Sequence, residues 1–193
     1  MPHESTRPLS SGARLTAALC LGLLLAGPAS AADYVQTTGS TLGFSGQYQG
    51  DAFNGRFPGF ATVLSFDPAK PELGRLTVVI PLATATAGNP DYNSELRGAS
   101  FFNSPKFPQA RYTATRFRSL GGGRYAADGT LTLRGVSKPV TLSFTWTAGA
   151  KPVLSGTAVV KRLDFGVGDG DWADTKVIPN EIKITTKVVL KTK

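Results

Sequence analysis

The sequence predicts an all-β protein: a closed, eight-stranded antiparallel up-and-down barrel with a short helix and a lid in the connection 87–108. Two features of the chain lead to this prediction. Apolar and polar residues alternate at every second position over most of the chain after residue 40, which is typical of strands with one dry and one wet face. These runs are long, follow one another directly and are separated by turn residues, and closing such strands into a barrel leaves no exposed edge.

The chain begins with a segment that predicts a secretory signal peptide over residues 1–32. Two arginines precede an apolar run over 15–27, and small residues with an Ala-Ser-Ala pattern follow it. The apolar run is well short of the roughly 20 residues of a membrane-spanning helix, so cleavage after Ala31 or Ala32 is favoured over an N-terminal anchor. We therefore expect export to the periplasm or into the medium, and a single mature domain over 33–193.

The leader also contains the only histidine, cysteine and methionine of the chain, His3, Cys20 and Met1. A mature chain without imidazole or thiol has no Ser-His-Asp triad, no cysteine nucleophile and none of the usual haem, zinc or copper ligands. The leader holds two of the 21 basic and one of the 13 acidic residues, so 19 Lys and Arg remain against 12 Asp and Glu, a net charge of +7. The basic residues are scattered, which favours a solvated exterior over a site for anionic lipid or pyrophosphate and does not indicate nucleic-acid binding.

The strands are predicted in chain order from this alternation. The clearest one is Val140–Thr147, where Val, Leu, Phe and Trp alternate with Thr and Ser throughout. Asp67-Pro68 and the glycines at 121–123 mark reversals of the chain. Pro81 interrupts the third strand, and we interpret it as a bulge or a bend in the wall. The eight predicted strands cover residues 40–49, 56–67, 74–86, 109–119, 123–134, 138–148, 152–165 and 179–191.

The connection 87–108 is long for a loop between two strands. Within it, Asp91 to Arg97 can form a short helix that ends at Gly98. The segment also carries four large apolar side chains: Leu96, Phe101, Phe102 and Phe107. These side chains are too apolar to remain in water, so we expect the segment to cover one end of the barrel as a lid or plug.

Several short motifs in a fixed order resemble one family over nearly the whole mature chain. The motifs are Gly55-Arg-Phe, Phe66-Asp-Pro68, Glu95-Leu-Arg97, Ser100-Phe-Phe-Asn103, Phe107-Pro-Gln-Ala-Arg-Tyr112, Gly129-Thr-Leu-Thr-Leu-Arg-Gly-Val-Ser-Lys-Pro-Val-Thr-Leu142, Asp164-Phe-Gly-Val-Gly168 and Glu181-Ile-Lys-Ile184. No single motif is specific, but together they resemble the YceI-like family of periplasmic polyisoprenoid-binding proteins. The resemblance implies a lipocalin-like antiparallel barrel. It also implies a long isoprenoid chain, such as a quinone tail or a polyprenyl pyrophosphate, in an elongated apolar cavity.

The chain departs from the family pattern in one place. Many family members place Arg-Asp before the segment that matches Glu95-Leu-Arg97, and a His next to its Leu, whereas this chain has Asn93-Ser94-Glu95. We take Glu95 and Arg97 as candidate head-group residues, and we expect the head-group preference to differ here. A function that depends on that imidazole should not be transferred to this chain.

Inward-facing positions mix large side chains with small ones such as Gly46, Gly156 and Ala158, which can leave a tunnel along the barrel. The alternative is a solid core in which large and small residues interdigitate. The family resemblance favours the cavity. Our cavity candidates are Phe44, Phe60, Leu76, Val78, Ile80, Leu96, Phe101, Phe102, Tyr112, Leu131, Leu133, Leu142, Phe144, Trp146 and Ile184.

We expect no metal site and no catalytic residue. Four aspartates, Asp164, Asp169, Asp171 and Asp174, have a spacing that can serve Ca²⁺, but the run lacks a complete calcium loop and is more often a solvated turn. We expect no cofactor other than a bound isoprenoid lipid or quinone. The expected partner is such a lipid or another long apolar molecule, and the expected state is a monomer or homodimer that does not span a membrane.

Three classes of function stay open at this point. The favoured class is a non-catalytic periplasmic carrier, or a stress-related protein that sequesters a lipid in the barrel interior. The second is an enzyme of isoprenoid or quinone metabolism that uses carboxylates such as Asp91 and Glu95. The third is an outer-membrane barrel, which needs aromatic girdles at the strand ends that the sequence does not show.

Overall fold

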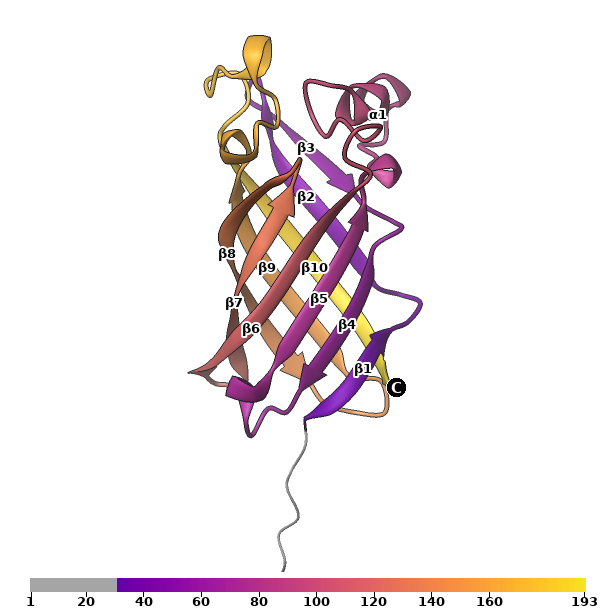
Figure 1. The fold of residues 1–193 in the computed structure, drawn as a ribbon, viewed down its shortest axis with the longest axis vertical. Helices are drawn as coiled ribbons and strands as arrows, with labels where there is room; N and C mark the ends of the chain where they lie inside the picture. The colour runs from indigo at the N-terminus through magenta and orange to yellow at the C-terminus, as the bar shows by residue number, and fades with distance from the viewer. Residues whose placement is uncertain (1–30) are drawn as a thin grey trace, which may run out of the picture.

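Ten strands form one antiparallel sheet that closes on itself, as Figure 1 shows. The structure is a computed structural model that describes residues 31–193, so the predicted signal peptide lies outside the described residues except for its last two positions. The strands are β1 (Ala32–Gln36), β2 (Thr41–Tyr48), β3 (Asp51–Arg56), β4 (Ala61–Phe66), β5 (Arg75–Pro81), β6 (Gln109–Gly121), β7 (Arg124–Leu133), β8 (Val136–Thr147), β9 (Val153–Lys161) and β10 (Glu181–Thr192).

The ten strands occupy eight positions around the barrel, because two positions are each shared by two short strands. Both β1 and β2 pair with β10, β4 pairs with β1, and β3 pairs with β2. From β4 to β10 each strand pairs with the next along the chain, and the pairing of β1 with β10 closes the ring. The predicted eight-stranded antiparallel barrel is therefore confirmed.

The prediction omits two strands and extends two others too far. It does not separate β1 from β2 or β3 from β4, because the segments 37–40 and 57–60 interrupt the first two wall positions, one between β1 and β2 and the other between β3 and β4. Pro81 is the last residue of β5 rather than a bend within it, and a 3₁₀ turn follows over Leu82–Thr84. β9 likewise ends at Lys161 and continues as a 3₁₀ turn over Arg162–Phe165.

The helix α1 (Pro90–Arg97) forms in the long connection as predicted. Asn89 caps its start, because the side-chain Oδ1 accepts a hydrogen bond from the backbone N–H of Asp91 at 2.8 Å. Pro90 is favourable at the first helical position and Gly98 ends the helix. Figure 1 places α1 and the connection 162–180 at one end of the barrel, which we call the mouth, while the C-terminus lies at the opposite, closed end.

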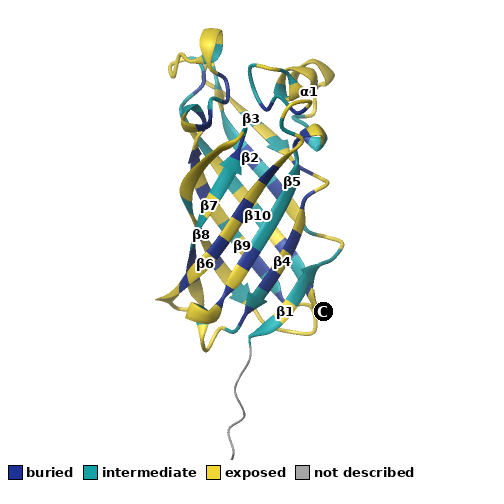
Figure 2. Cartoon of the chain, in the orientation of Figure 1, coloured by how far each residue is buried: buried dark blue, intermediate teal, exposed yellow. Residues whose placement is uncertain are grey.

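The closed end is filled by aromatic side chains. The Phe66 ring is fully buried and lies 5.1–5.8 Å, centroid to centroid, from four other rings. Those rings belong to Phe117, Tyr125, Phe144 and Trp146. In Figure 2, buried and exposed residues alternate along the strands, which is the period-two pattern expected of a barrel wall with a dry interior. The core therefore begins as a solid plug at this end.

On the outer wall, Asp128 accepts hydrogen bonds from the Thr141 hydroxyl at 2.7 Å and from Arg118 Nε at 3.3 Å. The Thr141 bond first, and then the Arg118 contact, hold the pKa of Asp128 below its usual 3.8. A lowered pKa in the folded state stabilises the fold above the unfolded-state pKa, and this contribution is lost as the pH falls below about 4 through the folded-state pKa. We expect Asp128→Asn to remove less than about 1 kcal/mol, because the pair is solvent-screened. The free energy of unfolding, measured with urea at several pH values below about 5, should depend less on pH in the variant than in the wild-type protein. An equal pH dependence in both proteins would show that Asp128 makes no such contribution.

Candidate functional site

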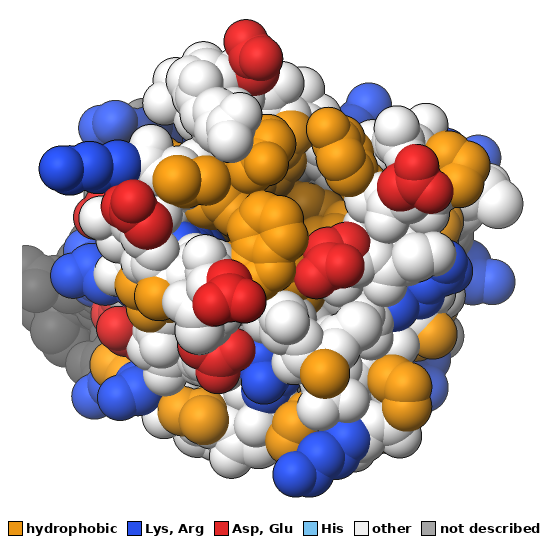
Figure 3. Space-filling view, turned by 90° about the horizontal axis from the view of Figure 1, so that it is seen from above, with side chains coloured by type: hydrophobic (Ala, Val, Ile, Leu, Met, Phe, Trp, Pro, Cys, Tyr) orange, Lys and Arg blue, Asp and Glu red, His pale blue; other side chains and the backbone are white. Residues whose placement is uncertain are grey.

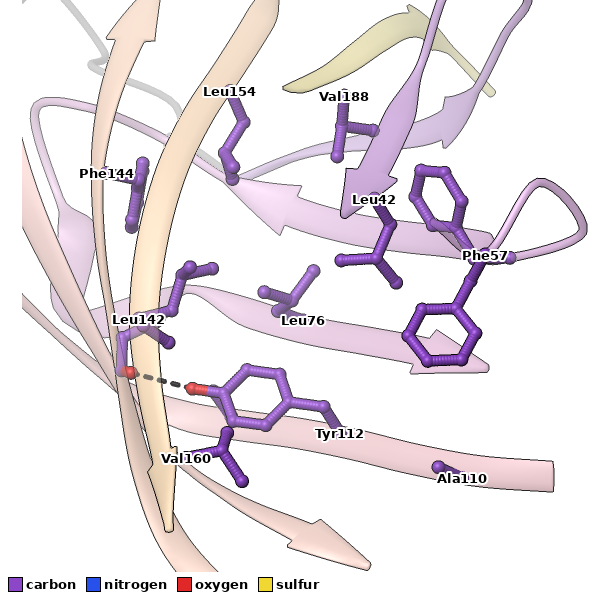
Figure 4. Packing of buried hydrophobic residues seen from close by; sticks show 14 of the residues in the cluster. Leu42, Phe57, Leu76, Ala110, Tyr112, Leu142, Phe144, Leu154, Val160 and Val188 are labelled. Atoms are coloured by element: carbon purple, nitrogen blue, oxygen red, sulfur yellow. Dashed lines mark hydrogen bonds between the residues drawn. The ribbon is translucent and has the colours of Figure 1, made fainter. Parts of the chain in front are cut away.

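Between the aromatic plug and the mouth, the barrel encloses a cavity of about 300 Å³. Side chains from strands all round the wall, from α1 and from both mouth connections line it, and nearly all of them are apolar. Figure 4 shows Leu42, Leu76, Tyr112 and Val160 pointing from different strands toward a common space. This volume lies at the lower end of the range of small-molecule sites. The interior is therefore part solid core and part cavity.

The cavity exists because small residues take inward positions where the wall would otherwise fill it. Ala110 on β6 and Ala158 on β9 both line the cavity. Near the plug, by contrast, large rings occupy the inward positions of β4, β7 and β8. Large and small inward residues are mixed along the sequence, but in the structure the aromatic rings gather at the closed end of the barrel.

Tyr112 is a polar side chain whose hydroxyl group is fixed in the wall of the cavity. Its hydroxyl lies 2.8 Å from the Ala127 carbonyl oxygen and 3.1 Å from that of Val140, and Figure 4 marks one such bond with a dashed line. Burial raises the pKa of Tyr112 far above its usual value, so the phenol stays protonated and donates. A Cβ atom on Gly129 would lie 2.7 Å from the Tyr112 hydroxyl oxygen, which explains the glycine at that position.

The structure places twelve of the fifteen cavity candidates on the cavity wall. They are Phe44, Leu76, Val78, Ile80, Leu96, Phe101, Phe102, Tyr112, Leu131, Leu133, Leu142 and Ile184. Their contact with a ligand stays a prediction. The remaining three, Phe60, Phe144 and Trp146, lie elsewhere, and for these three the assignment to the cavity wall is corrected.

Alternation predicts whether a side chain faces the interior, but it does not predict how far along the barrel axis that side chain lies. Phe144 and Trp146 face inward as predicted, but both pack against Phe66 in the plug. Phe60 is buried just before β4, where the strand position is divided, and its carbonyl oxygen accepts a hydrogen bond from Gln36. Inward direction was predictable for these residues, whereas their distance from the mouth was not.

Aromatic side chains cover the mouth as the predicted lid. The Phe102 ring lies 5.5 Å from the Phe57 ring and 6.3 Å from the Phe44 ring. Across the opening, the Trp172 ring lies 5.5 Å from Phe101 and 6.2 Å from Tyr48. The lid therefore has two halves, one from 82–108 and one from the connection 162–180, that meet through ring contacts.

Arg134 joins the two halves of the lid to the wall. It stands at the tip of the hairpin between β7 and β8, where Arg134 and Gly135 both have positive φ, as a two-residue hairpin turn requires. Its guanidinium donates to the carbonyl oxygens of Ser100 at 3.2 Å, Phe101 at 2.6 Å and Gly166. One side chain thus bonds to both connections at the mouth.

Arg162, which is 3% exposed, organises the connection 162–180. Its Nε donates to Pro179, one terminal nitrogen donates to Val167 and Gly168, and the other donates to Trp172 and Ile178, in each case to the carbonyl oxygen. All five N–H donors of the guanidinium therefore have partners. Burial lowers the pKa of Arg162, and the five carbonyl oxygens compensate the buried charge.

Sequence reasoning missed both arginines, although the chain carries a signal for one of them. Leu154, Gly156, Ala158 and Val160 are the inward positions of β9, and Arg162 continues that row by two residues. A charged residue at an inward position indicates a buried role in holding backbone carbonyls. Arg134 carries no such signal, because its role depends on the turn geometry.

The two head-group candidates are separated by the structure. Glu95 lines the cavity at its mouth, whereas Arg97 is exposed and does not line it. Within residues 31–193, no three carboxylates come together as a group that could hold a metal ion. No helix in the same part of the chain has the length and apolar character to cross a membrane.

A closed up-and-down barrel with an apolar, lidded cavity and one solid end belongs to the class of small barrels that enclose a ligand-sized space. The model of the YceI-like domain matches residues 34–190, and the chain belongs to this family. The resemblance seen in the motifs is thereby confirmed.

Individual relatives agree with this assignment. A UPF0312 protein of Pseudomonas savastanoi pv. phaseolicola is 31% identical over 173 residues, which cover 82% of this chain and 90% of that protein. Among solved structures, BcnA of Burkholderia cenocepacia is 30% identical, with a TM-score of 0.75 over 78% of this chain and 95% of that one. A polyisoprenoid binding domain from Saccharophagus degradans shares the fold at 16% identity, with a TM-score of 0.66 over 84% of this chain and 99% of that one.

Proposed function

We propose that the protein binds one long apolar molecule of the isoprenoid type in the barrel cavity and performs no reaction on it. The observation that carries the proposal is the 300 Å³ apolar cavity with its aromatic lid. Support also comes from the shared fold of the Saccharophagus degradans polyisoprenoid binding domain and from membership of the YceI-like family. A prenyl chain or a quinone tail has the shape and the apolar surface that this space requires.

Burial alone supplies enough free energy for such binding. Each CH₂-sized group moved from water into an apolar space gains about 0.8 kcal/mol, so a few isoprene units suffice without any charged contact. The lid is the route by which the ligand enters and leaves, because its aromatic side chains cover the open end of the cavity. The carboxylates of Asp91 and Glu95 are exposed at the mouth, which is a poor environment for acid–base work on a buried chain.

We also propose a periplasmic location, on the strength of the signal-peptide pattern in residues 1–32. Cell fractionation together with N-terminal sequencing of the purified protein tests this directly. The expected result is a periplasmic chain that begins at Ala32 or Asp33. Recovery of the full-length chain from the cytoplasm would contradict it.

The ligand proposal is tested on protein purified from its native host. We expect native mass spectrometry to show an added mass that organic extraction removes and that identifies as an isoprenoid lipid. Delipidated protein should then take up geranylgeraniol with one-to-one stoichiometry. Repeated ligand-free preparations that also take up no isoprenoid would overturn the proposal.

Filling the cavity should block uptake. Ala158 lines the cavity, whereas the next residue, Val159, points outward and is 56% exposed. We expect Ala158→Phe to weaken geranylgeraniol binding by at least about tenfold, at a cost of about 1–3 kcal/mol in stability from overpacking. Val159→Phe adds a ring on the outer face and serves as the matched control, with binding unchanged. Equal uptake by both variants, measured by titration of delipidated protein, would place the ligand outside the barrel.

A further inference from the structure

The wall of the cavity carries a buried hydroxyl group, that of Thr62. Thr62 on β4 is 3% exposed and lines the cavity, and its Oγ1 has no hydrogen-bond partner among residues 31–193. Leu64 and Phe66 follow it at two and four positions along the same strand and are fully buried, so the alternation of β4 directs Thr62 inward. A buried hydroxyl without a partner destabilises the fold, and a polar group of a ligand that reaches it removes this penalty.

A second unpartnered atom belongs to the neighbouring strand. β1 pairs with β4 with Val35 opposite Val63, and continuing this register by one residue places Gln36 opposite Thr62. The Gln36 amide nitrogen donates to the Phe60 carbonyl oxygen at 3.0 Å, while its Oε1 is buried without a partner in the described chain. The contact with Phe60 fixes which amide atom is the oxygen, since a flipped amide would set two acceptors against each other. Together the two side chains offer a hydroxyl group and a carbonyl oxygen that needs a donor.

The charges on the cavity wall argue against an anionic ligand. The charged residues that line the cavity are Glu95 and Arg162. Arg162 has all five of its donors bonded to backbone carbonyl oxygens, so its side chain has no donor left for a phosphate group. Glu95 contributes a negative charge at the mouth.

The surface around the mouth is predominantly negative, although Arg97, Lys106 and Lys176 are also exposed in its segments. Figure 3 looks down on this end and shows acidic side chains close around the apolar hollow, with most Lys and Arg side chains toward the periphery. The acidic residues in the mouth segments are Asp51, Asp91, Glu95, Asp164, Asp169, Asp171 and Asp174, and all of them are exposed. A pyrophosphate that enters or rests at this opening meets like charges, which lowers its affinity.

We propose that Thr62 and Gln36 form a buried subsite for the hydroxyl group of an uncharged long-chain ligand, and that the cavity therefore selects a prenyl alcohol over the pyrophosphate of the same chain. The ligand hydroxyl donates to Gln36 Oε1 and accepts from the Thr62 hydroxyl, which satisfies both unpartnered atoms. The inference rests on the proposed function, because it names the chemical class of the molecule held in the same cavity.

The test compares three probes that share one chain: geranylgeraniol, geranylgeranyl pyrophosphate and the corresponding hydrocarbon without a head group. Delipidated wild-type protein should bind the alcohol about tenfold or more tightly than the pyrophosphate, and more tightly than the hydrocarbon. Thr62→Val keeps the shape of the side chain and removes the hydroxyl. It should weaken alcohol binding by about two- to tenfold and leave hydrocarbon binding unchanged. Thr62→Ser should retain the preference for the alcohol.

A matched control is Thr113→Val, because Thr113 is exposed on the outer face of β6 and should affect none of the three probes. The inference fails if the pyrophosphate binds as tightly as the alcohol, or if Thr62→Val affects all three probes equally or none of them. In either case, retained hydrocarbon binding leaves the proposed function standing. If wild-type protein binds none of the probes, both proposals fail together.

Discussion

Arg162→Met should lower the free energy of unfolding by about 3–5 kcal/mol. The substitution keeps much of the apolar length of the side chain but removes five hydrogen bonds to backbone carbonyl oxygens, and it leaves the buried ones among them without partners. The loss should be concentrated in the connection 162–180, because all five acceptors lie there. Urea unfolding measures the total, and amide hydrogen exchange should show faster opening of this segment than of the barrel strands.

Two further variants separate the loss of the hydrogen bonds from the loss of the charge. Arg162→Lys retains a positive charge but offers three donors in place of five, so its loss should be intermediate. Lys161→Met removes an exposed charge one residue earlier and should change stability by less than about 0.5 kcal/mol. If Arg162→Met were as stable as Lys161→Met, the five bonds would not hold the connection in solution.

Phe66→Ala should cost about 3–5 kcal/mol, through loss of the buried ring and the cavity that it leaves. The ring is fully buried and lies near four others, which come from β6, β7 and β8, so the space cannot collapse without moving several strands. The midpoint of urea unfolding should fall at a similar m-value. The plug is separate from the lined cavity, so geranylgeraniol binding by the folded fraction should persist.

The control lies on the same strand. Val63 points outward and is 50% exposed, and Val63→Ala should cost less than about 1 kcal/mol. Phe66→Leu, which keeps part of the apolar volume, should fall between the two. A Phe66→Ala loss no larger than that of Val63→Ala would show that the closed end is loosely packed.

Alternation in the sequence predicts which side chains face the interior, and this property transfers directly to the structure. Tyr112, Leu142 and Ile184 line the cavity because a strand directs every second side chain to the same face. The same rule could not separate Phe144 and Trp146 from them, since the position of an inward residue along the barrel depends on the stagger of neighbouring strands.

The parts that escaped prediction depend on long-range backbone geometry. The divided strand positions require knowledge that β1 and β2 share one neighbour, β10, which no local pattern contains. Arg134 acquires its role only when the hairpin tip reaches residues 100–101, more than thirty positions earlier in the chain. Whether the Thr62 hydroxyl group has a hydrogen-bond partner likewise depends on which side chains the surrounding strands place near it.

The two arginines at the mouth make all their hydrogen bonds to the lid through main-chain carbonyl oxygens, and Arg134 adds one contact to the Asp169 carboxylate at 4.0 Å. This has a consequence for how such barrels diversify. Every residue type supplies the same carbonyl group, so most side chains of 98–108 and 163–180 can change without loosening these hydrogen bonds. The exceptions are Gly166 and Gly168, which have positive φ, and a Cβ atom on Gly168 would lie 2.6 Å from the Arg162 guanidinium. The sequence of the lid can therefore vary while the barrel stays the same. Replacing its aromatic residues should alter which molecules enter, while the barrel, the plug and both arginine anchors remain as they are.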